Sequence, residues 1–225
     1  MTSVLLIPGA GGLGWYWHLV EAELRDRGHD ALAVDLTAVA TPGLPAYADA
    51  VVDAIDGRSD VALVAQSMGA FTAPLVWQRV PTRLVVFVNA MIPLPGETPG
   101  EWWDNVGSES ARRAAAERNG YSADFDLSTY FMHDIPDDLA ADMRARSHSQ
   151  LEESFDDVCT FDAWPAIPIH AIAGREDRFF PLELQQRIAR ERLGVDPDIV
   201  PGGHLAALSH PAEVASAITR YVGHA

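Results

Sequence analysis

Val61-Ala-Leu-Val-Ala-Gln-Ser67-Met-Gly69 has the pattern of a buried strand that ends on a serine and is followed at once by a helix. Small residues stand two positions before and two positions after the serine, at Ala65 and Gly69. A sharp strand-to-helix turn needs small neighbours there, because it presses these positions against the strand and the helix while it lifts the serine hydroxyl above the sheet. The stretch therefore predicts a nucleophile elbow at Ser67. A serine that only caps the helix is the alternative interpretation.

Apolar runs of strand length alternate with helix-periodic segments on both sides of this elbow. Such alternation is typical of βαβ units, in which the strands are parallel. The runs are nearly continuous in Val, Ile, Leu and Ala, as expected for strands that are covered on both faces. We predict an α/β fold with a mostly parallel central sheet and helices on both faces. The expected strands are residues 4–8, 31–36, 61–66, 84–89, 167–173 and 198–200.

The alternation stops once, between residues 91 and 164, where no strand-like run occurs. A segment of this length is too long for a connecting loop in a compact domain. Its large apolar side chains, Trp102 and Trp103 among them, argue against a disordered insertion. We therefore expect an inserted, mainly helical cap. The expected bounds are 1–90 and 165–225 for the core and 91–164 for the cap, with cap helices near 108–118 and 137–153.

An acid and a histidine follow the last two expected strands. Asp177 lies on the loop after the fifth strand, and His204 comes just after the sixth. With Ser67 they stand at the carboxyl ends of three parallel strands, the edge where open α/β sheets build their sites. The chain order Ser, Asp, His is the order that accompanies such an elbow. Glu176 is the rival acid, and the position within the loop favours Asp177.

These three residue types match one chemistry. A serine hydroxyl is a poor nucleophile until a base removes its proton, and an imidazole titrates close to neutral pH. A carboxylate beside the imidazole selects its tautomer and stabilises the imidazolium that forms. We predict a catalytic triad with Ser67 as nucleophile, His204 as general base and Asp177 as the orienting acid.

A glycine-rich loop, Pro8-Gly-Ala-Gly-Gly-Leu-Gly14, follows the first expected strand. One interpretation is a dinucleotide-binding turn with Asp35 as the ribose ligand, but the third glycine of that fingerprint is missing. The alternative is an oxyanion loop, in which the backbone N–H groups of Ala10 and Met68 converge on the negative charge that develops on the substrate. We predict the oxyanion loop and no cofactor.

Stretches at both ends of the chain match one known family. They are Ile7-Pro-Gly-Ala10, Gly14-Trp-Tyr-Trp-His18, the Gly28-His29 turn, Val34-Asp35-Leu36, Gln66-Ser-Met-Gly69 and His204-Leu-Ala-Ala-Leu-Ser-His-Pro211. They resemble the α/β-hydrolase superfamily and, within it, the branch of the plant methyl-ester esterases and hydroxynitrile lyases. The resemblance implies the α/β-hydrolase fold and an activity on small esters or cyanohydrins. It does not extend to residues 91–164.

Two departures from that branch bear on the activity. Pro8 stands where most relatives have the histidine of a His-Gly pair. The lyases carry a threonine in the oxyanion loop and a lysine directly after the catalytic histidine, whereas Gly9 and Leu205 stand here. A leaving cyanide ion would have no lysine cation beside it, so the resemblance favours ester hydrolysis over lyase chemistry.

The charge balance excludes several classes of partner and chemistry. The formal net charge is −16, and every basic residue apart from histidine is arginine. Such a surface repels nucleic acids and anionic membranes, so we expect neither as a partner. Without lysine the chain has no Schiff-base or P-loop chemistry. The histidines show no metal-ligand spacing, and we expect no metal.

The single cysteine and the start of the chain bear on location. Cys159 has no partner for an internal disulfide, and we expect a buried apolar residue and not a nucleophile. Met1 leads almost directly into the first expected strand, and no apolar stretch has the roughly 20 residues that cross a bilayer. We expect a cytoplasmic protein. We also expect a homodimer, only because homodimers are the commonest oligomers of soluble proteins.

Three functions remain open from the sequence. The preferred one is a serine hydrolase that cleaves a small carboxylic ester, lactone or thioester through an acyl-enzyme. A ligand-binding receptor on the same fold, with slow turnover or none, is the second. A lyase or cyclase that uses the same triad is the third.

We expect a small-molecule substrate whose pocket belongs largely to the cap. The candidates for its lining are Gly9, His18, Trp102 and Trp103. Arginines of the cap either receive an anionic substrate or form a solvated helix face, and the pattern does not decide between the two. They are Arg112, Arg113, Arg144 and Arg146.

Overall fold

A six-stranded parallel sheet lies at the centre of the computed structural model, which describes residues 2–146 and 155–224. The strand order within these residues is β2-β1-β3-β4-β5-β6, and neighbouring strands are parallel throughout. The strands are β1 (Ser3–Ile7), β2 (Asp30–Ala33), β3 (Val61–Gln66), β4 (Thr82–Val88), β5 (Ile169–Gly174) and β6 (Asp198–Val200). The predicted parallel sheet is confirmed, and β3 and β6 have the predicted bounds.

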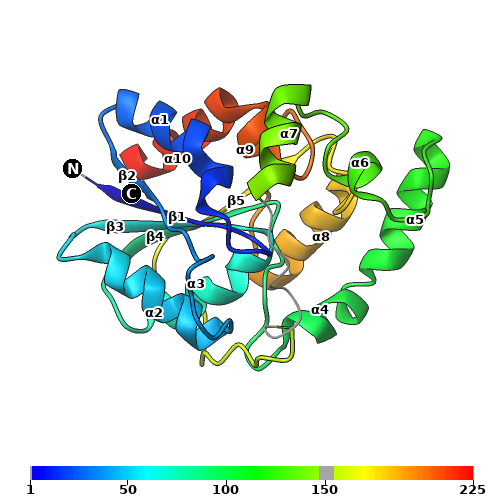
Figure 1. Cartoon of the computed structure of the whole chain (residues 1–225). Coiled ribbons are helices and arrows are strands. Elements are labelled where there is room, and N and C mark those ends of the chain that lie inside the picture. The colour runs from blue at the N-terminus through cyan, green and yellow to red at the C-terminus, as the bar shows by residue number, and fades with distance from the viewer. Residues whose placement is uncertain (1, 147–154, 225) are drawn as a thin grey trace.

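Each face of the sheet carries its own hydrophobic core, because successive side chains of a strand point to opposite faces. Leu63 and Phe87 belong to the core under α2, α3 and α8, whereas Val64 and Val86 belong to the core under α1, α9 and α10. Figure 1 shows these helices on opposite sides of the sheet, as predicted. Their bounds are α1 (His18–Asp26), α2 (Leu44–Ile55), α3 (Thr72–Trp77), α8 (Leu182–Leu193), α9 (Ala206–Ser209) and α10 (Pro211–His224). Over the described ranges, no helix combines the length and apolarity that a membrane span requires.

β2 ends earlier than predicted, because Asp35 turns the chain. The predicted strand continues to residue 36, but β2 ends at Ala33. Asp35 Oδ2 accepts a hydrogen bond from Gly14 N at 3.0 Å, and Asp35 Oδ1 accepts one from Thr37 N at 3.0 Å. The carboxylate therefore fastens the glycine-rich loop to the end of β2, which explains Asp35 without a ribose ligand.

Residues 91–164 supply helices and, in their described part, no strand of the sheet. The helices are α4 (Pro99–Asn105), α5 (Ser108–Asn119), α6 (Leu127–Tyr130) and α7 (Asp137–Arg146). Trp102 of α4 lies in the core under α2, α3 and α8, and Ala140 of α7 lies in the core of the other face. The segment is thus anchored in both cores (Figure 1). That it forms an inserted cap stays a prediction, and the predicted continuation of α7 to residue 153 lies outside the described residues.

Cys159 is fully buried, as predicted, and its Sγ lies 3.3 Å from the carbonyl oxygen of Phe71. Burial and, to a smaller extent, the charge of Glu97 raise the pKa of the Cys159 thiol to about 12. The thiol therefore stays protonated at neutral pH, where only a thiolate would act as a nucleophile.

A buried ion pair fastens the start of the 91–164 segment to α8. Arg192 Nη1 and Nη2 donate to the two carboxylate oxygens of Glu97 at 2.5 and 3.0 Å, and Nη1 also donates to Ile92 O at 2.6 Å. The two side chains are only 7% and 4% exposed. Removal of either partner would leave the other charge buried without a counter-charge.

Arg192→Met is expected to lower the free energy of unfolding by about 3–5 kcal/mol, since it leaves the Glu97 carboxylate buried and unpaired. Urea unfolding followed by circular dichroism measures the loss. Arg190→Met is the matched control on the same helix. It breaks an exposed pair with Asp196 and is expected to cost less than about 1 kcal/mol. Equal losses in the two variants would show that burial of the pair is unimportant.

Candidate active site

Ser67 lies at the turn between β3 and a short 3-10 helix, η2 (Ser67–Phe71), that leads into α3. Its φ is 50°, in the left-handed region that residues other than glycine rarely adopt. Backbone strain of this kind concentrates at functional sites, where the surrounding structure holds it in place. The turn has the geometry of the predicted elbow, with the serine at the carboxyl end of a buried strand.

The glycine-rich loop after β1 packs directly against this elbow. A Cβ atom on Gly69 would lie 2.3 Å from the Pro8 carbonyl oxygen, and a Cβ atom on Gly9 would lie 2.9 Å from Ser67 Cβ. Both positions therefore need glycine for the loop and the elbow to come this close. The sequence predicted that Gly69 must be small because it packs against the strand and the helix of the elbow. In the structure the nearest backbone atoms belong to Pro8, in the loop after β1.

Gly69→Ala is expected to lower the free energy of unfolding by about 1–3 kcal/mol, because the added methyl group meets backbone atoms that cannot easily move. Gly223→Ala is the control within α10, where an added Cβ meets nothing within 4 Å. Because Gly223 is the penultimate residue of α10, that change is expected to alter the free energy of unfolding by less than about 0.5 kcal/mol. Chemical unfolding of both variants provides the comparison. A Gly69→Ala protein as stable as wild type would contradict the close packing of loop and elbow.

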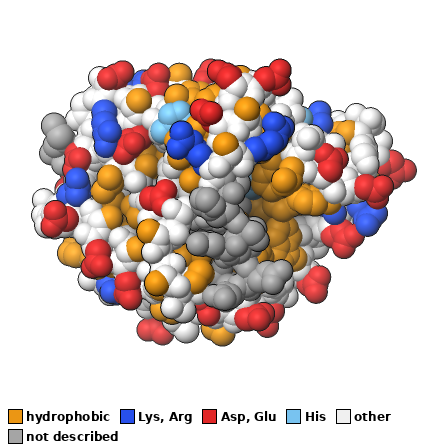
Figure 2. Space-filling model, viewed as in Figure 1, with side chains coloured by type: hydrophobic (Ala, Val, Ile, Leu, Met, Phe, Trp, Pro, Cys, Tyr) orange, Lys and Arg blue, Asp and Glu red, His pale blue; other side chains and the backbone are white. Residues whose placement is uncertain are grey.

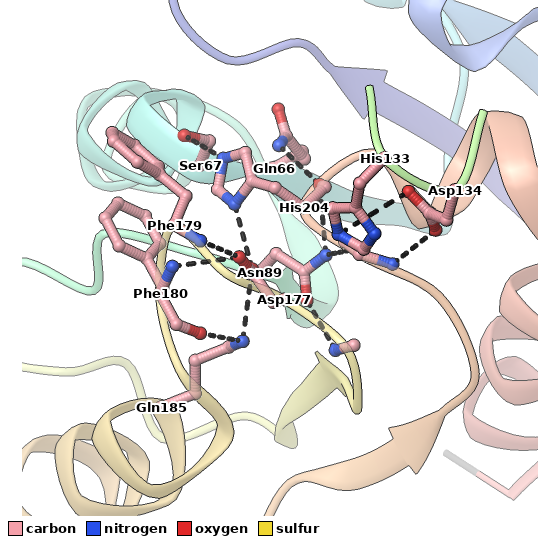
Figure 3. A network of polar contacts seen from close by, with 12 residues as sticks. Gln66, Ser67, Asn89, His133, Asp134, Asp177, Phe179, Phe180, Gln185 and His204 are labelled. Atoms are coloured by element: carbon pink, nitrogen blue, oxygen red, sulfur yellow. Dashed lines mark hydrogen bonds and ion pairs between the residues drawn. The ribbon is translucent and has the colours of Figure 1, made fainter. Parts of the chain in front are cut away.

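His204 and Asp177 reach Ser67 from the loops after β6 and β5. His204 Nε2 lies 3.1 Å from Ser67 Oγ, and His204 Nδ1 lies 2.9 Å from Asp177 Oδ2. All three residues are buried. Figure 3 shows the three side chains joined in one line of polar contacts. The structure thus brings together the three residues that the sequence singled out, and their catalytic roles stay a prediction.

The Asp177 carboxylate lies among donors only. Oδ1 accepts hydrogen bonds from the backbone N–H groups of Phe179 and Phe180 at 2.9 and 2.8 Å. Oδ2 accepts one from Gln185 Nε2 at 3.2 Å and faces His204 Nδ1. The Phe179, Phe180 and Gln185 groups all donate, and the carboxylate oxygens accept from them. Nδ1 of His204 then carries the imidazole proton, and Nε2 is left as an acceptor.

Glu176, the rival acid, binds elsewhere. Its Oε2 accepts a hydrogen bond from Gly202 N at 2.6 Å, and the residue is exposed. Asp177 is the carboxylate that contacts His204. The preference for Asp177 over Glu176 therefore agrees with the geometry.

The family follows from a comparison with known proteins. Residues 4–217 match the sequence model of the Alpha/beta hydrolase family. The chain belongs to that family. It is 28% identical to Methylesterase 3 of Arabidopsis thaliana over 48% of this chain and 47% of that protein. It is 30% identical to Probable esterase PIR7A of Oryza sativa subsp. indica over 43% of this chain and 41% of that protein. The match spans less than half the length of these relatives.

Solved structures share the fold over nearly the whole chain. Polyneuridine aldehyde esterase superposes with a TM-score of 0.79 at 16% identity, covering 98% of this chain and 99% of that chain. A pyrethroid hydrolase from Sphingobium faniae JZ-2 superposes with a TM-score of 0.77 at 20% identity, covering 99% and 98%. At these identities the likeness concerns the fold alone, and it confirms the predicted α/β-hydrolase fold.

In this α/β-hydrolase, two amides from the sheet hold the histidine loop. Asn89 Nδ2 donates to Gly203 O at 2.9 Å and to His204 O at 3.0 Å, while Asn89 Oδ1 accepts from Gly174 N at 2.6 Å. Gln66 Nε2 donates to His204 O at 3.3 Å. Neither residue was predicted from the sequence as part of the site. The available signal was a polar residue at the end of an apolar strand, at position 66 and again at position 89.

Three phenyl rings surround the His204 imidazole. The rings of Phe131, Phe179 and Phe180 lie nearly perpendicular to it, with ring centroids 5.0, 5.1 and 4.9 Å away. The site is therefore shielded from water, and electrostatic interactions inside it are stronger than at the surface. Only Phe131 comes from the 91–164 segment.

The two predicted oxyanion residues lie beside the elbow. Ala10 and Met68 line the same small cavity, together with Gly9. Met68 is the second residue of η2, and the first N–H groups of a helix have no acceptor within the helix. Its N–H is thus in a suitable place to bind an anion, and the oxyanion role itself stays a prediction.

Two of the predicted pocket residues have packing contacts. Trp102 has no exposed surface, and its indole N–H donates to Ile92 O at 3.1 Å. His18 stacks on Trp15 at a centroid distance of 4.4 Å, and its Nδ1 lies 2.8 Å from Trp15 O. These contacts account for both residues without a substrate.

Trp103 lines a cavity of about 360 Å³, together with Phe125 and Phe179. Phe179 also packs against His204, so one ring separates the cavity from the imidazole. Figure 2 shows hydrophobic side chains gathered in a hollow on this side of the molecule, next to the atoms drawn in grey. Gly9, the fourth candidate, lies against Ser67, and which of the four contact substrate stays a prediction.

The four arginines singled out in the 91–164 segment differ in their surroundings. Arg113 pairs with Glu109, whereas the Arg112 guanidinium lies over the Tyr130 ring at 4.9 Å and lines the cavity beside Trp103. Arg146 lies over the ring of Trp15, and Arg144 is exposed.

Residues 2–146 and 155–224 bring no three His, Cys, Asp or Glu side chains together in a way that could hold a metal ion.

Proposed function

We propose that this α/β-hydrolase is a serine hydrolase that cleaves small carboxylic esters through an acyl-enzyme. One observation carries the proposal: Ser67, His204 and Asp177 form an unbroken line of contacts of 3.1 and 2.9 Å at the carboxyl edge of the sheet. The names of its relatives, methylesterase and probable esterase, support an ester as the substrate.

The geometry supports a proton path between Ser67 and the leaving group. Ser67 Oγ attacks the ester carbonyl carbon while its proton moves to His204 Nε2. The tetrahedral intermediate collapses, the ester C–O bond breaks, and His204 returns the proton to the leaving alcohol. A water molecule, deprotonated by His204, then attacks the acyl carbon. The bond between that carbon and Ser67 Oγ breaks, His204 returns the proton to Oγ, and the carboxylic acid leaves. Asp177 stays ionised throughout and stabilises the imidazolium.

In this mechanism the backbone N–H groups of Ala10 and Met68 bind the oxyanion of the tetrahedral intermediate. Both residues line one small cavity, and Met68 directly follows Ser67 in the chain, which supports the assignment. Each such donor contributes roughly 3 kcal/mol of transition-state stabilisation.

Hydrolysis fits the site better than cyanide chemistry or pure ligand binding. The residue after His204 is Leu205, a buried apolar side chain, so no cation stands there to stabilise a leaving cyanide. A receptor would have no need of strained backbone at Ser67 or of a fully hydrogen-bonded Asp177 carboxylate.

A fluorophosphonate probe tests the nucleophile, because it reacts with activated serines. We expect one adduct, on the peptide that contains Ser67, located by mass spectrometry. A series of p-nitrophenyl esters with increasing acyl length then tests turnover, and the short esters are expected to react fastest. An adduct on another serine would overturn the site. Labelling of Ser67 without ester turnover would favour the receptor instead.

A further inference from the structure

A short stretch of the 91–164 segment reaches the loop that carries His204. Asp134 lies between α6 and α7, and its Oδ2 accepts hydrogen bonds from Gly203 N at 2.6 Å and from Ser209 Oγ at 2.8 Å. Figure 3 shows Asp134 and His133 on the far side of His204 from Ser67. Ile135, the next residue, is buried in the core under α1, α9 and α10, so the stretch is itself anchored.

The glycines before His204 match this contact. A Cβ atom on Gly203 would lie 2.7 Å from His133 Nε2 and 2.9 Å from Asp134 Oδ1. A Cβ atom on Gly202 would lie 2.9 Å from Ser209 Oγ. Any larger residue would push the histidine loop away from Asp134, so the pair of glycines allows the 91–164 segment to come this close.

Different groups hold the two peptide bonds around Gly203. Asn89, from the sheet, donates to the carbonyl oxygens of Gly203 and His204. Asp134, from the other side, accepts the Gly203 N–H. The backbone that leads into His204 is therefore held between the sheet and the 91–164 segment, and the imidazole position depends on both.

Charge pairing with His133 is not what holds Asp134. His133 Nε2 and Asp134 Oδ1 lie 3.9 Å apart, and neither atom forms a hydrogen bond with any part of the chain that the structure describes. Burial lowers the pKa of His133, against the smaller opposing effect of the Asp134 charge, so the imidazole is neutral at neutral pH. The Asp134 carboxylate is thus engaged mainly by Gly203 and Ser209.

We propose that Asp134 is a positioning residue, through which the 91–164 segment sets the place of His204 between Ser67 and Asp177. The proposal rests on the proposed function, because it assigns Asp134 a role in the same reaction. Asp134 touches neither the substrate nor the reacting atoms; it acts through the Gly203 peptide and the Ser209 hydroxyl. A displacement of about 1 Å in a reacting group can lower a rate by about 10²-fold, so a modest shift of this loop has a measurable effect.

Asp134→Ala, which removes both hydrogen bonds, is expected to lower kcat for a short aryl ester by about 10- to 100-fold. KM is expected to change less than about threefold, since substrate contacts are intact. Asp134→Asn is expected to recover most of kcat. Its amide oxygen replaces Oδ2 toward Gly203 and Ser209, and its NH₂ group faces His133 Nε2. Asp142→Ala removes an exposed carboxylate of α7 and is expected to leave both constants unchanged.

Ser209→Ala keeps the proposal testable if Asp134→Ala does not fold. It deletes the hydroxyl contacts with Asp134 and with His210 Nδ1 but keeps the Gly203 N–H bond to Asp134, and it is expected to lower kcat a few-fold with KM unchanged. Urea unfolding identifies the variants that are folded. Wild-type kcat in folded Asp134→Ala, or in Ser209→Ala where Asp134→Ala is unfolded, would overturn the proposal. An equal loss in Asp134→Asn and Asp134→Ala would overturn it as well, because charge and not hydrogen bonding would then be responsible.

A spectroscopic readout separates this proposal from the proposed function. His204 Nδ1 lies 2.9 Å from Asp177 Oδ2, and we expect the proton between them to give a low-field proton NMR resonance whether or not esters are turned over. We expect this resonance to shift or broaden in Asp134→Ala and to return in Asp134→Asn. An unchanged resonance in Asp134→Ala contradicts the positioning role. Failure of the wild-type protein to label or to hydrolyse contradicts the proposed function alone.

Discussion

Ser67→Ala is expected to lower kcat/KM for a short-chain aryl ester by about 10⁴-fold or more. The Ser67 hydroxyl is the group placed to form the acyl-enzyme, and without it His204 has only water to activate. The residual rate would come from oxyanion binding and substrate orientation. The fold is expected to survive, because the side-chain hydrogen bond of Ser67 is with His204. Initial rates with a fluorogenic ester measure the loss.

Ser128→Ala is the matched control for that experiment. Ser128 is an exposed serine of α6, and its replacement is expected to leave the rate and the fluorophosphonate adduct unchanged. If Ser67→Ala keeps more than about one-hundredth of the wild-type rate, another nucleophile carries the reaction.

Asp177→Asn is expected to lower kcat by about 10⁴-fold. The two oxygens of Asp177 face only donors: two backbone N–H groups, the Gln185 amide and His204 Nδ1. An asparagine must turn its NH₂ group either toward the two backbone N–H groups or toward Gln185 and His204. If the oxygen stays with the backbone N–H groups, the NH₂ group faces Nδ1, selects the wrong imidazole tautomer and places a proton on Nε2. The Ser67 hydroxyl then has no acceptor for its proton.

Glu176→Gln is the control for this prediction, and kcat is expected to stay within a few-fold of wild type. Glutamine keeps an oxygen that can accept the Gly202 N–H. The two variants also settle the choice of acid in solution. A large loss in Glu176→Gln together with a small one in Asp177→Asn would assign the acid to Glu176.

The sheet and the triad contacts could be predicted because their signals are local. A strand covered on both faces is apolar along its whole length, so β3 was predicted with the bounds that the structure shows. The strand ends then placed Ser67, Asp177 and His204 at one edge. The predicted β2 was too long, since the side-chain contacts of Asp35 with Gly14 and Thr37 have no signature in hydropathy.

The residues around the triad could not be predicted, because their partners are distant in sequence. Asn89, Asp134 and Gly203 become neighbours only after the sheet and the 91–164 segment have come together. Trp102 and Trp103 show the same limit within one helix. Neighbouring residues of a helix point about 100° apart, so Trp102 is buried in a core while Trp103 lines a cavity.

The anchoring of the 91–164 segment in both hydrophobic cores has a consequence for protein engineering. The sheet separates the two cores, but Trp102 of α4 packs in one core and Ala140 of α7 packs in the other. Asp134 lies between Trp102 and Ala140 in the chain and contacts the loop that carries His204. Repacking around Trp102 in one core or around Ala140 in the other is therefore expected to change the support of His204, the proposed general base. Laboratory evolution of this scaffold thus has two regions, one on each face of the sheet, in which the proposed turnover is expected to be adjustable without replacing Ser67, Asp177 or His204.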